Sequence, residues 1–159
     1  MVGVDVTDGD FVGEAHDGRS ADRDARGEEL FGAGDGGVAR AREREVFGQR
    51  LAELGMVQRL LADSEIDIEA SRSLIWRAAA WQLDQGDRAA QETSIAKTFV
   101  AEAVGRVVDR ALQICGALGV SNDILLSRFY REVRPFRIYD GPSETHRWAI
   151  ARRAVRQAG

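Results

Sequence analysis

The chain has 159 residues, of which 44% are hydrophobic and 30% charged, as in an ordinary soluble globular protein. This length fits one domain with some additional sequence. The net charge of −4 gives no indication of nucleic-acid binding. No apolar run is long enough to span a membrane and no signal-peptide pattern opens the chain, so we expect neither feature. The single cysteine, Cys115, cannot form an internal disulfide, which fits a reducing, cytoplasmic environment.

The first 37 residues differ in character from the rest of the chain. They contain ten acidic residues against three arginines and nine of the 17 glycines, and their apolar residues follow no sustained period. Such a segment cannot bury enough apolar surface to offset its chain entropy. We therefore expect residues 1–37 to be disordered or non-homologous, with one helical turn near Glu28–Phe31 and a break at Gly34–Gly37.

From Val38 onward, apolar residues recur at helical spacing. A short helical piece is predicted over Ala39–Glu45, and four helices are predicted over Leu51–Gln85, Ala89–Leu118, Asp123–Arg134 and Ser143–Gln157. No window alternates convincingly with a period of two residues, so we expect no sheet. The pattern predicts an all-α fold, an antiparallel helical bundle over residues 38–159 with two long and two shorter helices.

The two long helices each carry an apolar face. In the first, this face consists of Leu54, Val57, Leu61, Ile68, Ile75 and Ala79; in the second, of Ala96, Phe99, Val100, Ala103, Val107, Ala111, Ile114 and Cys115. Gly86 is expected to end the first helix, and Gly116 with Gly119 to close the second as left-handed residues. Pro135 should stop the third helix, and Pro142 followed by Ser143 is typical of a helix start.

Five groups of residues carry a resemblance to a known family. They are Arg44–Gly48 (REVFG), Leu61–Asp63 with Ala70–Arg72, Glu92–Lys97 (ETSIAK), Gln113–Gly119 (QICGALG), and Tyr130–Glu132 with Ile138–Gly141 (IYDG). In this order and spacing, they resemble the C-terminal helical domain of the acyl-CoA dehydrogenases, flavoproteins that oxidise an acyl-CoA thioester to the trans-2-enoyl-CoA. The resemblance implies that domain's bundle, here with an incomplete first helix, because the helical pattern ends upstream of Val38.

Asp140 stands where the family has its catalytic carboxylate. Most members have Glu at this position, but a subgroup has Asp-Gly-Pro, and Ile138–His146 (IYDGPSETH) resembles that subgroup. The resemblance implies that Asp140 removes the α-proton of the thioester while hydride leaves the β-carbon for the flavin. The alternative is that Asp140 only caps the following helix or accepts hydrogen bonds within a turn. His146 is given no role.

Four further residues match family positions on the flavin side. Arg44 and Phe47 resemble residues that reach FAD across a dimer interface, and an arginine fork suits a pyrophosphate. Gln113 and Gly116 resemble the turn that supports the adenosine diphosphate part of the neighbouring subunit's FAD. The alternatives are that Arg44 belongs to a solvated charge run and that Gly116 only ends a helix. The family's next glycine is Ala117 in this chain.

The resemblance implies an oxidoreductase acting on CH–CH bonds, with FAD as cofactor and acyl-CoA as substrate. It also implies a homodimer or homotetramer, and an electron-transferring flavoprotein as electron acceptor. Because the family's β-barrel has no counterpart in this sequence, we expect the isolated chain to be inactive. The alternative is a non-catalytic helical interaction or dimerisation module derived from the family. No His, Cys and acidic residues show metal-ligand spacing, so no metal site is predicted.

Overall fold

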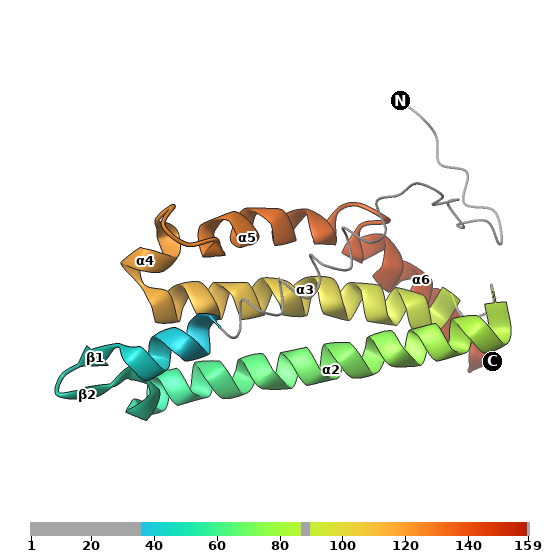
Figure 1. The fold of residues 1–159 in the computed structure, drawn as a ribbon. Helices are drawn as coiled ribbons and strands as arrows, with labels where there is room; N and C mark the ends of the chain where they lie inside the picture. Colours follow the sequence, from blue (N-terminus) through green and yellow to red (C-terminus); the bar gives the residue numbers. More distant parts are fainter. Residues whose placement is uncertain (1–35, 87–89, 159) are drawn as a thin grey trace.

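The computed structural model describes residues 36–86 and 90–158. It is a bundle built around one long helix, α3 (Ala90–Cys115), with α2 (Gly55–Gln85) antiparallel along one side and α5 (Leu126–Val133) along the other (Figure 1). The short helix α4 (Ala117–Val120) lies at one end of α3, and α6 (Ser143–Gln157) packs near the other end. A 3-10 helix, η3 (Arg134–Arg137), links α5 to α6. The predicted all-α antiparallel bundle is confirmed.

The start of the described chain differs from the prediction. Residues 36–43 are helical, so Gly36 and Gly37 do not break the helix. The reason is tertiary: the Gly37 backbone is buried, and a side chain there would contact Ala111 and Ile114 of α3 at 3.6–3.7 Å. The other expectations for residues 1–37, including the turn near Glu28–Phe31, lie outside the described residues.

A two-stranded hairpin follows, although no sheet was expected. Strands β1 (Glu45–Val46) and β2 (Gln49–Arg50) pair antiparallel and lead into a 3-10 helix, η1 (Leu51–Glu53). Two residues per strand are too few to show a period of two, so the periodicity could not reveal the hairpin. Positive φ at both central residues, Phe47 and Gly48, is what a two-residue type I′ turn requires.

The core lies along α3. Its buried residues are Val104, Val108, Ala111 and Cys115 with Leu126 and Val133 from α5, and beside them Ala41, Val57 and Ile114. The predicted apolar face of α3 is confirmed, because all its residues are buried or half-buried. The predicted face of α2 is confirmed only for its first half, since Ile75 and Ala79 are exposed. Trp76 is also exposed, so the second half of α2 presents apolar side chains to solvent.

The glycines at the helix ends act in different ways. Gly86 and Gly116 follow the ends of α2 and α3 with positive φ, +55° and +61°, as predicted. Their ψ values of −130° and −135° lie outside the αL region expected for Gly116 and are accessible mainly to glycine. The prediction of a left-handed Gly119 was wrong: it lies within α4, where a Cβ would stand 2.9 Å from the carbonyl oxygen of Leu112. The α-helix α5 ends at Val133, two residues before Pro135, as predicted, and the chain continues as the 3-10 helix η3, in which Pro135 is the second residue.

One ion cluster joins the two long helices. Asp67 of α2 is buried and accepts hydrogen bonds from Arg106 of α3 at 2.6 and 3.0 Å, and from Arg110 at 2.7 Å. Arg110 also donates to the backbone oxygen of Asp63 at 3.1 Å. The hydrogen bond from Arg106 lowers the pKa of the Asp67 carboxyl; burial opposes this effect and Arg110 adds to it.

Replacing Asp67 by Asn should destabilise the chain by about 3 kcal/mol, because it leaves two arginines without their buried anion. The native pKa of Asp67 lies below its ordinary value of 3.8, so its contribution to stability is present above that pH and is lost as pH falls below it. Urea unfolding of Asp67→Asn at pH 7 and pH 3 measures both effects, and the difference between the two proteins should shrink at pH 3.

The matched control is Asp63→Asn, because among residues 36–86 and 90–158 that carboxylate pairs only with the exposed Arg59, at 3.8 Å. It should change stability by less than about 1 kcal/mol. Equal losses in the two variants would contradict the special role of Asp67.

The contrast between two glycines tests the packing of α4. Gly119→Ala should destabilise the chain by about 1–3 kcal/mol, because the added methyl group meets the Leu112 backbone. Gly105→Ala, in the middle of α3 with no atom within 4 Å of the new methyl group, should stabilise it by about 0.5–1 kcal/mol. Thermal unfolding followed by circular dichroism measures both, and shifts of the same sign would contradict this account.

Candidate active site

Asp140 lies in a tight turn between η3 and α6. Its φ is +53°, and that of Gly141 is +85°. Residues other than glycine adopt positive φ uncommonly, and such a conformation persists only where its surroundings hold it. The Asp140 side chain is exposed. A strained backbone that presents a carboxylate to solvent is a reasonable starting point for a functional site.

Side chains from two helices contact this turn. Lys97 of α3 donates a hydrogen bond from Nζ to the carbonyl oxygen of Gly141. Nε2 of His146, in the first turn of α6, lies 3.0 Å from the carbonyl oxygen of Asp140. Gly141 must be glycine in this arrangement, because a Cβ there would stand 2.8 Å from Nε2 of His146. Two successive carbonyl groups beside the carboxylate are therefore held by side chains.

The electrostatics of the turn centre on Lys97, which is half-buried. Burial lowers the pKa of its ammonium group, while the carboxylates of Asp140 and Glu144 act in the opposite direction. The turn thus brings one cation and two acidic groups together.

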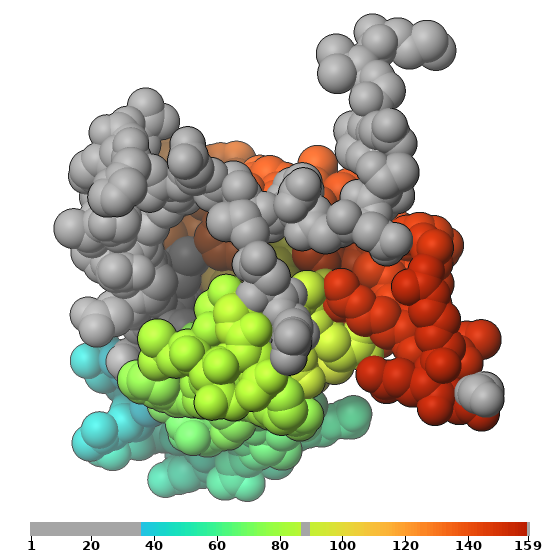
Figure 2. All heavy atoms as spheres, turned by 90° about the vertical axis from the view of Figure 1, so that its right-hand side faces the viewer, coloured from blue at the N-terminus to red at the C-terminus, as the bar shows by residue number. Residues whose placement is uncertain are grey.

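Figure 2 views the molecule from the side on which the end of α2 (yellow-green) and α6 (red) lie on either side of the start of α3.

Asp140 does not occupy the N-cap position of α6. That residue is Pro142, and no side-chain cap hydrogen bond is present there among the described residues. Ser143, the first residue of α6, is fully buried, and its hydroxyl has no hydrogen-bond partner among the described residues. An unsatisfied buried hydroxyl is uncommon in folded proteins. Sequence reasoning missed Ser143 as a site residue, because a serine at a helix start usually indicates only a cap.

The segments on both sides of the turn are tied to α3 by a second side chain. Glu102 of α3 pairs with Arg147 of α6, and lies 3.8 Å from Arg137 of η3. Lys97 and Glu102 are five residues apart in α3. The same helix therefore provides a cation for the turn and an anion for its flanks.

The predicted flavin-side residues Gln113 and Gly116 lie together at the other end of α3. They line a hollow of about 560 Å³ between α3, α4 and α5, with Asp109, Leu112, Val120, Ser127, Tyr130 and Arg131. Nothing lies within 4 Å of a Cβ placed on Gly116, so the backbone there is open to close approach. This opening can accept a polar group next to the exposed Gln113 side chain.

Arg44 and Phe47 belong to the hairpin at the same end of the bundle (Figure 1). The backbone of Arg44 closes the hairpin base, since its carbonyl oxygen accepts from the Leu51 amide at 2.8 Å and its amide donates to Arg40 at 3.0 Å. Its side chain is exposed. Phe47 is 94% exposed and has a φ of +52°. A bulky apolar residue in such a conformation is a genuine outlier.

The five predicted site residues therefore form two groups, not one. From Lys97, beside the Asp140 turn, to Gln113 the α3 helix rises about 24 Å. Arg44 and Phe47 belong to the hairpin and Gln113 and Gly116 to the end of α3, at one end of the bundle, whereas the Asp140 turn contacts Lys97 near the start of α3. One chain does not bring Asp140 and the predicted flavin-side residues together.

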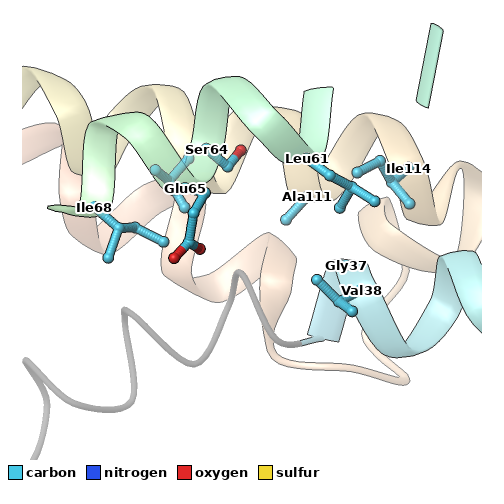
Figure 3. Close-up of a pocket in the computed structure, with 9 residues that line it drawn as sticks. Gly37, Val38, Leu61, Ser64, Glu65, Ile68, Ala111 and Ile114 are labelled. Atoms are coloured by element: carbon cyan, nitrogen blue, oxygen red, sulfur yellow. The ribbon is translucent and has the colours of Figure 1, made fainter. Parts of the chain in front are cut away.

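A second hollow, of about 50 Å³, lies where residues 37 and 38 face the two long helices (Figure 3). Apolar residues, Leu61 and Ile68 of α2 with Ala111 and Ile114 of α3, line it together with the polar Ser64 and Glu65. It is too small for a cofactor or an acyl-CoA and contains none of the predicted site residues. This hollow is not a candidate for the active site.

The described residues contain no cluster of three or more His, Cys, Asp or Glu side chains that could hold a metal ion. Among the helices of residues 36–86 and 90–158, none is long and apolar enough to cross a membrane.

Comparison with known proteins adds independent information. Residues 32–155 match the family described as acyl-CoA dehydrogenase, C-terminal domain. The chain is 34% identical to cyclohexane-1-carbonyl-CoA dehydrogenase of Geobacter metallireducens, over 98% of this chain and 43% of that protein. It is 38% identical to 3-(aryl)acrylate reductase of Clostridium sporogenes, over 74% of this chain and 31% of that protein.

The fold of the chain is similar to that of glutaryl-coenzyme A dehydrogenase in its complex with glutaryl-CoA, with a TM-score of 0.77. The two sequences are 27% identical, and the match covers 82% of this chain and 33% of the dehydrogenase chain. The chain spans less than half the length of each of these relatives. The family match covers both groups of site residues and extends to residue 155 in α6. The chain therefore belongs to the acyl-CoA dehydrogenase family, whose C-terminal domain it contains.

Proposed function

We propose that this chain forms the C-terminal part of an FAD-dependent enzyme that oxidises the α,β-bond of an acyl-CoA thioester, with Asp140 as base. The observation that carries the proposal is the strained turn that holds Asp140 at the surface while Lys97 and His146 bind its backbone. A residue held in this way keeps a defined position, which a base needs for proton transfer.

The residues present fit the flavin at one place. The hollow at Gln113 and Gly116 offers an open backbone, side-chain polar groups and space for part of a nucleotide. When bound, FAD supplies the acceptor for the hydride that leaves the β-carbon.

The proposed step for this chain is proton abstraction. The carboxylate of Asp140 takes the α-proton, so the α-carbon to hydrogen bond breaks and its electron pair becomes part of the new double bond. Together with the loss of hydride from the β-carbon, this leaves the enoyl thioester. Asp140 is the aspartate version of the family's base, with Ile138–His146 resembling the Asp-Gly-Pro subgroup.

Because the two residue groups lie apart on one chain, we propose that each site combines the base of one chain with Arg44, Phe47, Gln113 and Gly116 of another. This requires at least a homodimer. The resemblance further supports an electron-transferring flavoprotein as the acceptor. The isolated chain is proposed to be inactive, because the exposed Asp140 is not enclosed with a substrate away from water.

A second candidate function is a non-catalytic association module. The specific observation in its favour is the exposed apolar surface on the second half of α2, where Trp76 is 75% exposed and Leu83 is 91% exposed. Large exposed apolar side chains on one helix are typical of an interface. The two candidates are compatible, because an enzyme assembled from such chains also needs interfaces.

The base is tested in a chimera in which residues 38–159 replace the matching segment of the Geobacter metallireducens relative. Asp140→Asn should lower kcat by roughly 10²–10⁴-fold, because the amide cannot accept the proton, while the bound flavin spectrum stays unchanged. Glu144→Gln is the matched control, since Glu144 is the other carboxylate that acts on Lys97. Full turnover in Asp140→Asn, or an equal loss in Glu144→Gln, would contradict the assignment.

Phe47→Asn separates stability from cofactor binding. Asn tolerates positive φ before Gly48, so the isolated chain should become more stable by about 1 kcal/mol. In the chimera the same change should reduce the flavin retained on gel filtration, measured by visible absorbance. Leu83→Asn removes an equally exposed apolar side chain away from the hairpin and should leave flavin retention unchanged. Equal retention in both variants would contradict a flavin-side role for Phe47.

A further inference from the structure

We propose that Lys97 and His146 are positioning residues for the base: they hold the two successive carbonyl groups of the Asp140–Gly141 turn and so fix the direction of the Asp140 carboxylate. Neither residue was assigned a role from the sequence. The inference rests on the proposed function, because it concerns the residue proposed there as the base.

The turn needs contacts that hold its backbone conformation. Asp140 and Gly141 have φ values of +53° and +85°, and an aspartate left to itself favours negative φ. Asp140 is exposed, so packing of its own side chain in a core does not impose this conformation. The constraint therefore has to come from contacts to the backbone of the turn.

The contacts to these two carbonyl groups come from two different helices, α3 and α6. Lys97 reaches the Gly141 oxygen from α3, and His146 reaches the Asp140 oxygen from α6 at 3.0 Å. A carbonyl oxygen only accepts, so Nε2 of His146 carries the proton in this contact. Rotation of the Asp140–Gly141 peptide would break the contact to His146, and rotation of the Gly141–Pro142 peptide would break the contact to Lys97. The first rotation would also be limited by the close approach of the His146 ring to Gly141.

The environment of Lys97 suits a lysine at this position. Lys97 is the only lysine among 22 basic residues of the chain. It is half-buried, and the charged groups that act on it are Asp140 in the turn and Glu144 in α6. Burial lowers the pKa of the ammonium group, which is therefore partly removed from water. A compact ammonium group can donate to a carbonyl group at such a site while it remains close to both carboxylates.

Glu102 allows the positioning role of Lys97 and His146 to be distinguished from the packing of the segments that flank the turn. Glu102 ties Arg137 and Arg147 to α3 and so anchors the flanks of the same turn, but it contacts neither carbonyl group. If the contacts to the flanking segments alone fixed the turn, the loss of Glu102 would change the conformation of Asp140 as much as the loss of Lys97. If Lys97 and His146 fix it, the loss of Glu102 should leave the conformation of Asp140 unchanged.

The first measurement uses the unmodified 159-residue chain. Because Lys97 is the only lysine, labelling with ¹³C,¹⁵N-lysine gives NMR signals from that one side chain. We expect its Cε signal to titrate below the ordinary lysine pKa of 10.5, and its ammonium protons to exchange slowly because they are hydrogen-bonded. An ordinary titration with rapidly exchanging protons would overturn the inference, and this result needs no variant to fold.

The second measurement reads the backbone of Asp140. A strong NOE between the Hα and the amide proton of one residue is the signature of positive φ, and it should be present in the wild-type chain. It should weaken in Lys97→Met and in His146→Ala and persist in Glu102→Gln, with circular dichroism confirming that each variant is helical. Persistence in both test variants, or an equal loss in Glu102→Gln, would overturn the inference.

These outcomes are separate from the fate of the proposed function. If the chimera with intact Asp140 has no activity, or if Asp140→Asn keeps full turnover, the proposed function fails while the NMR results stand as a property of the turn. If Lys97 titrates as an ordinary lysine, the positioning role fails while the assignment of the base is unaffected.

Discussion

The ion cluster between Asp67 and the two arginines of α3 is the interaction on which the rest of the structure depends. It fixes α3 against α2 both along the helix and around its axis, because the carboxylate is buried and receives three hydrogen bonds in fixed directions. Apolar side chains alone leave more freedom for one helix to slide along another. With α3 fixed, the positions of everything attached to its two ends are also fixed.

Charged side chains of α3 also hold the turn that contains Asp140 and Gly141. Glu102 binds the flanks and Lys97 binds the turn itself, so a single helix determines where Asp140 stands. At the other end, α4 folds back onto α3 through the close approach of Gly119 to Leu112, which shapes the hollow beside Gln113. The length of α3 between these points separates Asp140, the proposed base, from the predicted flavin-side residues, and this separation is the structural reason for proposing sites shared between chains.

Much of the fold could be predicted because long helices carry strong periodic signals. The end of α2 at Gly86, the start of α6 at Ser143 and the apolar face of α3 follow from residue spacing and helix-end chemistry. The hairpin could not be predicted, because two-residue strands have no measurable period. The helical state of residues 36 and 37 depends on contacts with α3, which are distant in the sequence.

In the candidate site, too, contacts between residues distant in the sequence could not be predicted. Asp140, Arg44, Phe47, Gln113 and Gly116 were predicted as site residues from their motifs, whereas Lys97, Ser143 and His146 were not assigned roles. Their importance depends on distance: Lys97 lies 44 residues from the carbonyl group that it binds. No local pattern marks such a pair. The exposure of Ile75 on α2 was also missed, since periodicity identifies an apolar face but does not say whether the same chain covers it.

The central claim is that the base and the flavin-side residues of one chain serve different sites. It is tested most directly in hybrid dimers of the chimera, with Asp140→Asn in one chain and Arg44→Ala with Gln113→Ala in the other. Each parent dimer should be inactive. If sites are shared, one site of each hybrid combines an intact Asp140 with intact flavin-side residues, and turnover returns on mixing. If hybrids purified with two different affinity tags stay as inactive as their parents, the claim of shared sites is contradicted.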